Sequence, residues 1–290
     1  MLTDIVISRF SNLLFYIQRT GKCSPKKFDL EKYISEDNID VLFYGKNEKI
    51  IWKRLQKSIG REQMNRFQQV VKPLKLTFTS YWKKESKTVL KWKKYFQMHT
   101  TEINGMLNDS KKLCGIKHLS FSNVPIYLLS DPSTKSKEIN AWFSWTPKES
   151  FMVVEIPFGL QPSKNHFPIA VLCHEFFHLL LRKNQNLHSR IKECARTNSK
   201  FLTKIIDNGM PEKMFLEEVL LSSFLPEGYL SEKHLGIKIN QNPTKPKDLL
   251  DWRRHAAFEL KNVVKRYIEK GYVIDQKYLT LLINTLKAKK

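Results

Sequence analysis

The sequence predicts an α+β fold, because long helical patterns flank one short block of strands. Amphipathic helical patterns occupy four stretches, near 47–71, 76–112, 248–270 and 275–288. β-Branched and aromatic residues between turn-forming residues predict three strands, at 123–129, 139–145 and 151–158. An apolar helical pattern follows them, with Pro168 in its first turn and Ser163 or Asn165 near its N-cap. We therefore expect a small sheet followed by a buried helix.

The predicted elements suggest two regions along the chain. Residues 1–115 form a mainly helical region without a chemical motif, and residues 116–290 carry the sheet, the central helices and two C-terminal helices. With 290 residues, 41% of them apolar, the chain can bury a substantial core in one or two domains. A further helix is expected near 187–207, ending at Asn208 and Gly209, and a loop is expected at 236–247.

The predicted buried helix carries the string His174-Glu175-Phe176-Phe177-His178. Positions i and i+4 lie on one face of a helix, so both imidazoles can reach one metal ion, with Glu175 beside them. From the composition, about 0.01 chance matches to H-E-x-x-H are expected in a chain of this length. The alternative is that the three polar side chains only satisfy one another in the core. The motif predicts a metal site with a general base, Glu175, next to the two ligands.

This segment resembles the active-site helix of the zincin metallopeptidases, in which zinc has three protein ligands and one open position. The metzincin branch would need Gly at 181 and His at 184, whereas this chain has Leu181 and Asn184. In the gluzincin branch, thermolysin-like and aminopeptidase-like, the third ligand is a Glu on a later helix. The resemblance therefore implies a zincin-like core of gluzincin type and a zinc cofactor.

The third ligand is expected in the apolar helical stretch 214–225, which contains Glu217 and Glu218. Leu216 to Ser222 is similar to the ligand helix of aminopeptidase-like gluzincins, and the alignment puts Glu218 in the ligand position. Glu217 is the alternative, as a ligand or as a group that orients a ligand histidine. Weaker candidates are Glu193, Asp207 and Glu212.

The family resemblance also implies roles in peptide hydrolysis. Zinc held by His174, His178 and Glu218 would activate water, and Glu175 would act as the general base. Tyr229, placed in a loop after the ligand helix, is the expected donor to the developing oxyanion, with His234 or His255 as alternatives.

A short stretch of the second predicted strand, Asn140-Ala141-Trp142-Phe143, has its own resemblance. It is similar to the edge strand by which thermolysin-like enzymes hold a peptide main chain. That role would use backbone hydrogen bonds to an extended substrate. The alternative is an ordinary strand with packed aromatic side chains.

Composition suggests a second kind of partner. The net charge of +22 should attract polyanions, and lysines alternate with aromatic residues between Tyr81 and Phe96. Lysine greatly outnumbers arginine, however, and the aromatic residues fall at helical spacings that suit a packed face. We therefore expect a core-facing helix here, with weak nucleic-acid association arising from charge alone.

Other sequence features bear on location. The run from Ile5 to Ile17 lacks the basic start and cleavage site of a signal peptide, and no stretch is long enough for a membrane span. Four scattered cysteines show no metal or disulfide spacing, namely Cys23, Cys114, Cys173 and Cys194. The expected location is the cytoplasm.

The leading functional prediction is a zinc metallopeptidase acting on a peptide or protein substrate. A nucleic-acid-associated protease and a non-enzymatic zincin-like binding module are the alternatives. The sequence does not indicate the oligomeric state or the cleavage preference.

Overall fold

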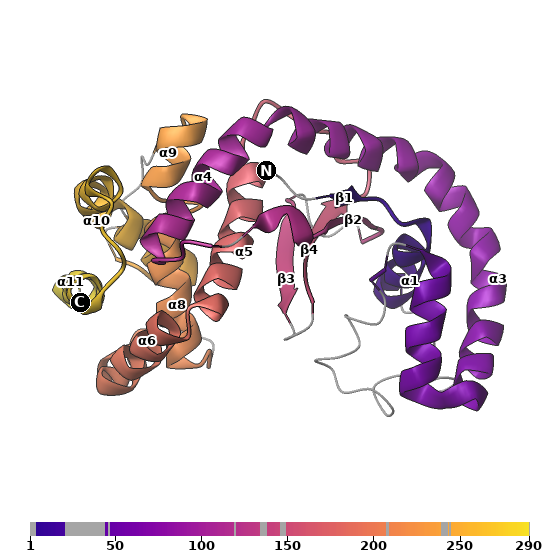
Figure 1. Ribbon diagram of the computed structural model, residues 1–290, viewed down its shortest axis with the longest axis horizontal. Helices are drawn as coiled ribbons and strands as arrows, with labels where there is room; N and C mark the ends of the chain where they lie inside the picture. Colours follow the sequence, from indigo (N-terminus) through magenta and orange to yellow (C-terminus); the bar gives the residue numbers. More distant parts are fainter. Residues whose placement is uncertain are drawn as a thin grey trace. The chain divides into compact units, whose positions relative to one another are not determined.

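The computed structural model describes residues 4–20, 44–45, 47–118, 120–133, 138–145, 149–206, 209–238, 243 and 245–289 (Figure 1). The chain divides into two compact units, each built from two stretches of sequence. Thr3–Met98 and Phe121–Lys164 form the sheet unit, and His99–Ser120 and Asn165–Lys290 form most of the helical unit. The predicted boundary between residues 115 and 116 falls inside the stretch His99–Ser120.

The described residues of the sheet unit form a four-stranded mixed sheet in the order β1-β2-β4-β3. The strands are β1 (Ile5–Val6), β2 (Ile126–Asp131), β3 (Asn140–Trp145) and β4 (Ser150–Pro157). β1, β2 and β4 are parallel, whereas β3 pairs antiparallel with β4. All three predicted strands are confirmed, with ends shifted by a few residues. β1 was not predicted, because a two-residue strand is too short to show an alternating pattern.

One face of this sheet packs against the helix α1 (Arg9–Thr20). Side chains alternate between the two faces of a strand, so odd-numbered residues of β2 and β4 share this face. Its buried cluster consists of Phe15, Tyr44, Tyr127, Leu129, Phe151 and Val153. The same alternation places Asp131 and Glu155 on this face, at the carboxyl ends of the two parallel strands.

The long helix α3 (Glu48–Met98) differs from the two helices predicted near 47–71 and 76–112. It continues through Pro73, because Phe67, Val71 and Phe78 on both sides of the proline are buried in one core cluster with α1. The non-helical residue lies at Gly60, whose φ is 77°. After Met98, the helix α4 (Thr100–Leu113) begins the helical unit.

The aromatic residues among the lysines of α3 face the core. Trp92, Tyr95 and Phe96 are all buried, which confirms the prediction of a core-facing helix. The lysines that remain exposed on this stretch include Lys83, Lys84, Lys87, Lys91 and Lys94. None of the helices in the described part of the chain has the length and apolar character needed to cross a membrane.

The helical unit is built around α5 (Phe167–Lys183), which packs against α4, α6 and α8 (Figure 1). Its other helices are α6 (Gln185–Thr197), α7 (Ser199–Leu202), α8 (Glu212–Ser222), α9 (Tyr229–Leu235), α10 (Leu249–Lys270) and α11 (Gln276–Ala288). Nearly every side chain of α5 from Ile169 to Leu181 is buried, as its apolar sequence predicts. Asn165 accepts a hydrogen bond from the backbone N–H of Phe167 at the start of this helix.

Two details of the helical unit differ from the sequence prediction. The helix expected near 187–207 ends at Thr197 and is followed by the short α7. Tyr229 was expected in a loop, but it is the first residue of α9. The predicted helix end at Asn208 and part of the predicted loop at 236–247 lie outside the described residues.

Candidate metal centre

The helix α5 presents its motif side chains on one buried face. His174 is 4% exposed and His178 is 7% exposed, whereas Glu175 is partly exposed. One donor atom from each of these three residues lies within 4.8 Å of the donor atoms of the other two, so this group could hold a metal ion. The Nε2 atoms of the two histidines are only 3.1 Å apart. The i, i+4 spacing therefore brings both rings to one point, as predicted.

The helix α8 brings Glu218 to the same point. One of its carboxylate oxygens lies 3.0 Å from His178 Nε2, and the other lies 3.3 Å from His174 Nε2. Glu218 is thus the carboxylate that faces both nitrogens at once, and this geometry favours it over Glu175 as the third ligand. α8 packs against α5, and its residues Leu216, Val219 and Leu220 are buried.

Hydrogen bonds at the far side of each ring determine where the ring protons lie. His174 Nδ1 is 2.8 Å from the carbonyl oxygen of Leu225, and His178 Nδ1 is 3.0 Å from Glu217 Oε1. A carbonyl or a carboxylate can only accept, so both Nδ1 atoms must donate. In the neutral rings, both Nε2 atoms then carry lone pairs that point at each other and at Glu218. Such a cluster favours a positive charge at its centre, either a proton on His178 or a metal ion.

These distances fit a small tetrahedral ion. Zinc bonds of about 2.0–2.1 Å to nitrogen and oxygen place tetrahedral ligand atoms roughly 3.3 Å apart. The three separations among His174, His178 and Glu218 range from 3.0 to 3.3 Å. The nitrogen and carboxylate donors are also those that zinc takes in proteins. His174, His178 and Glu218 therefore fit a zinc ion without rearrangement of the helices.

Glu217 lies behind His178 and does not face the centre. It is 2% exposed, and its Oε1 also lies 3.6 Å from Arg182 Nη2. Lys213 Nζ approaches its other oxygen at 4.0 Å. Adjacent helix positions point about 100° apart, so Glu217 contacts His178 Nδ1 while Glu218 faces the two Nε2 atoms.

The cluster strongly favours positive charge at its centre. Burial lowers the pKa of His178, but hydrogen bonds to Glu217 and Glu218 outweigh burial and raise this pKa to about 10. Burial raises the pKa of Glu218, but its contacts with His174 and His178 hold that pKa far below its usual range. Burial also raises the pKa of Glu217, yet His178 and Arg182 bring it below the ordinary value.

Glu175 shows the opposite shift. Burial raises its pKa, and the nearby His174 and His178 offset this effect only in part. A carboxylate whose pKa is raised toward neutrality holds and releases a proton more readily near pH 7. The pKa values of the two glutamates beside the histidines are thus shifted in opposite directions, upward for Glu175 and far downward for Glu218.

Arg253 of α10 was not predicted at this site. Its Nη1 lies 3.8 Å from Glu218 Oε2, and its Nη2 lies 3.2 Å from Glu227 Oε1. No sequence motif marks this arginine, which reaches the cluster because α10 packs on α8.

The loop between α8 and α9 supplies two groups to the cluster, the Leu225 carbonyl and Glu227. Gly228 closes this loop. A Cβ atom at Gly228 would lie 2.1 Å from the carbonyl oxygen of Ser223, so only glycine fits this backbone path.

The remaining predicted residues are placed elsewhere or are not joined to the cluster. In the described part of the chain, Tyr229 takes part in none of the hydrogen bonds and ion pairs that hold the cluster. His234 binds Asp109, and His255 faces the carbonyl oxygen of Thr285. Glu193 is exposed and pairs with Arg196, and Glu212 accepts hydrogen bonds from Ser199 and Thr203. Asp207 lies outside the described residues.

The stretch Asn140-Ala141-Trp142-Phe143 forms most of β3, in the sheet unit. Among the described strands, β3 is bonded only to β4 and so lies at an edge of the sheet. An edge strand has backbone groups available for pairing with another chain.

No family model matches the chain, and no curated protein or solved structure shows significant similarity to it.

Proposed function

We propose that this chain is a zinc-dependent peptidase with a zincin-like core of gluzincin type. The observation that carries the proposal is the convergence of His174 Nε2, His178 Nε2 and the Glu218 carboxylate within 3.0–3.3 Å of one another. Both Nδ1 protons are committed elsewhere, so these atoms offer lone pairs and a negative charge to one cation.

Three side chains would hold the ion, namely His174, His178 and Glu218. When bound, zinc would lower the pKa of a water molecule and polarise the scissile carbonyl. The Leu225 carbonyl and Glu217 would keep the two imidazoles in the correct tautomer and orientation. Arg253 would stabilise the negative charge of Glu218 through its ion pair with that carboxylate.

Glu175 would move the proton. Its place between the histidines and its raised pKa suit a general base that accepts a proton from water and passes it to the leaving amine. Tyr229 remains the proposed donor to the oxyanion, because it follows the loop that carries Leu225 and Glu227. Within the sheet unit, β3 lies at an edge among the described strands, and an extended peptide would pair with such an edge through its main chain.

Elemental analysis of protein purified without added metal tests the proposal. We expect one zinc per chain, and we expect the metal to be strongly depleted in His174→Ala. His118→Ala is the matched control, because His118 is exposed and belongs to no part of the cluster. Equal metal content in wild type and His174→Ala would refute the site.

Peptide hydrolysis separates this proposal from a non-enzymatic binding module. We expect the zinc-loaded protein to cleave members of a degenerate peptide library, as detected by mass spectrometry. Bound zinc without cleavage of any member would favour the binding module instead.

A weak association with nucleic acid is a second candidate property, favoured by the net charge of +22 and by the exposed lysines of α3. Trp92, Tyr95 and Phe96 are buried, so base stacking on these three is not available. Binding should therefore be insensitive to nucleotide sequence and should fall steeply with salt.

We also propose a cytoplasmic location, since the described cysteines Cys114, Cys173 and Cys194 are free and buried.

A further inference from the structure

The helical unit contains a basic cluster that holds none of the proposed zinc ligands. Its members come from three helices that pack on one another. Arg182 lies in the last turn of α5, His188 in the first turn of α6 and Lys213 in the first turn of α8. We refer to these three residues as the basic cluster.

His188 holds the two cationic side chains of the basic cluster together. Arg182 Nη1 and Lys213 Nζ each lie 2.5 Å from His188 Nε2. Arginine and lysine can only donate, so His188 Nε2 is the acceptor. Burial lowers the pKa of His188, and Lys213 and Arg182 lower it further, which keeps the ring neutral. A single nitrogen lone pair thus brings a guanidinium and an ammonium group side by side.

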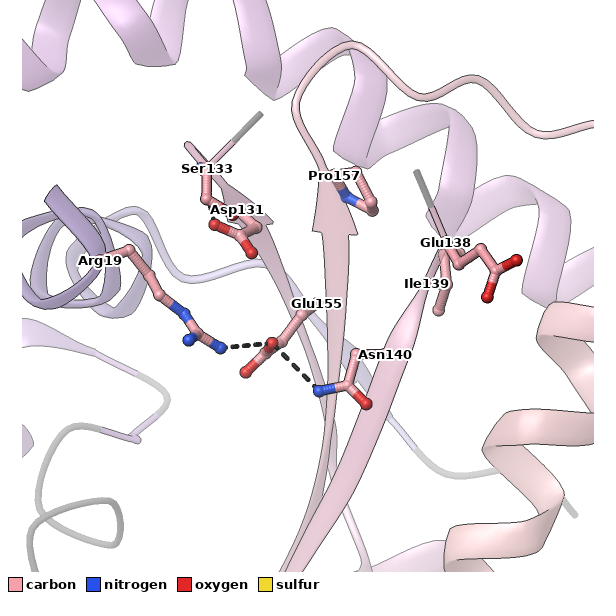
Figure 2. Close-up of a pocket in the computed structure, with 8 residues that line it drawn as sticks. All are labelled: Arg19, Asp131, Ser133, Glu138, Ile139, Asn140, Glu155 and Pro157. Atoms are coloured by element: carbon pink, nitrogen blue, oxygen red, sulfur yellow. Dashed lines mark hydrogen bonds and ion pairs between the residues drawn. The ribbon is translucent and has the colours of Figure 1, made fainter. Parts of the chain in front are cut away.

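The positive charge of this cluster is not neutralised at close range. In the sheet unit, Arg19 shows a neutralised arginine, because its Nη2 lies 2.7 Å from Glu155 Oε2 (Figure 2). In the described part of the helical unit, the acidic partner of the cluster is Glu217, which lies 3.6 Å from Arg182 Nη2 and 4.0 Å from Lys213 Nζ. Both distances are longer than a hydrogen bond.

Glu217 does not offset both cations. It accepts a hydrogen bond from His178 Nδ1 at 3.0 Å, so its single negative charge is shared with that ring. Burial lowers the pKa of Lys213, Arg182 lowers it further, and Glu217 opposes these effects only in part. An anion beside Arg182 and Lys213 would therefore be favoured.

Such an anion can reach the cluster from solvent. The side chains of Arg182 and Lys213 are 31% and 27% exposed. A guanidinium group has five N–H donors and an ammonium group has three. Within the described residues, each of these two groups makes its hydrogen bond to His188. The other N–H groups can donate to a ligand that arrives from solvent.

The charges and the geometry select the class of ligand. Two cations repel a metal ion, and a carboxylate offers one charge and two oxygens in one plane. A terminal phosphate group offers three oxygens in different directions and carries about 1.5–2 negative charges at pH 7. Arginine also binds phosphate through two parallel hydrogen bonds. We propose that the basic cluster binds a terminal phosphate group, supplied by free phosphate or by a small phosphate monoester.

The test is isothermal titration calorimetry of the full-length protein near neutral pH and at constant ionic strength. Inorganic phosphate and methyl phosphate should bind at least about tenfold more tightly than dimethyl phosphate or acetate, which carry one charge each. Absence of phosphate binding, or equal affinity for all four anions, would overturn the proposal. Clearly tighter binding of inorganic phosphate than of methyl phosphate would identify the free ion as the ligand, and the reverse order would identify a monoester.

Two substitutions each remove one charged donor. Arg182→Gln and Lys213→Gln should each weaken phosphate binding at least about tenfold. Arg190→Gln is the matched control, because Arg190 lies on α6 and its Nε donates to Asn186, outside the cluster. Wild-type affinity in either folded variant would contradict the assignment, so one folded variant is sufficient.

The variant His174→Ala separates this site from the proposed metal centre. Phosphate oxygens can also bind zinc, but such binding would disappear with the metal. We expect His174→Ala to bind phosphate with an affinity close to that of the wild type, and loss of binding would overturn the cluster assignment. A wild-type protein that contains no zinc would refute the metal centre and leave phosphate binding by the cluster unchanged.

Discussion

Two buried carboxylate clusters, one in each unit, satisfy their charges in opposite ways. In the sheet unit, Glu155 faces three N–H donors, from Arg19, Asn140 and Trp142. In the helical unit, Glu218 faces the two imidazole Nε2 atoms, and in the neutral rings the protons lie on the Nδ1 atoms at the far side. The first cluster is neutralised by Arg19, whereas the second gains a positive centre only from a proton on His178 or from a bound cation.

The difference shows why burial of a carboxylate is a poor guide to function by itself. Glu155 is as deeply buried as His174, yet its partners leave nothing for an ion to bind. What marks the α5–α8 cluster is that its electron-pair donors converge on one point, where a metal ion could replace the proton of His178. The predictions below test that distinction.

The largest effect is expected for the metal affinity of Glu218→Ala. Removing this carboxylate leaves two histidines and should deplete bound zinc almost completely. Glu217→Ala should weaken binding only about 10- to 100-fold, because it frees the His178 ring without removing a ligand. Competition with a zinc chelator measures both values. A greater loss in Glu217→Ala than in Glu218→Ala would reverse the two roles.

The second effect concerns activity without loss of metal. Glu175→Gln keeps the volume of the side chain but cannot accept a proton, so peptide hydrolysis should fall by about 10²–10⁴-fold. Zinc content should stay at the wild-type level. Activity within tenfold of wild type would show that Glu175 is not the base, and lost zinc would indicate that it is a ligand.

A third prediction is the pH dependence of metal affinity. The pKa of His178 in the metal-free protein is raised to about 10, so this ring is protonated at neutral pH and a metal ion must displace that proton. Affinity should therefore rise about tenfold per pH unit between pH 6 and 8. Chelator competition at several pH values measures the slope. A flat profile would contradict the proton placement.

The smallest effect is expected at the completed cluster. Glu155→Ala leaves the partly buried indole N–H of Trp142 and the amide of Asn140 without their acceptor, which should cost about 1–3 kcal/mol of unfolding free energy in urea. Zinc content should not change. Glu149→Ala is the control, since its pair with Arg54 is partly exposed and should contribute less than about 1 kcal/mol. Loss of zinc in Glu155→Ala would contradict the separation of the two clusters.

Local sequence was sufficient for the elements themselves. The strands β2, β3 and β4 follow from alternating apolar residues, and α5 follows from a continuous apolar run that starts near Pro168. Sequence patterns did not predict helix boundaries correctly where tertiary packing outweighs local sequence preference. α3 continues through Pro73 because Val71 and Phe78 are anchored in one core, and α9 begins at Tyr229 without a recognisable pattern.

The sequence by itself determined that His174 and His178 share one helix face with Glu175 beside them, because that follows from helical geometry alone. Only the tertiary structure decided that Glu218 faces the two Nε2 atoms while Glu217 supports His178. The same holds for Arg253, for the Leu225 carbonyl and for the basic cluster around His188. These groups come from separate elements, and their meeting depends on how α6, α8 and α10 pack, which no local spacing encodes.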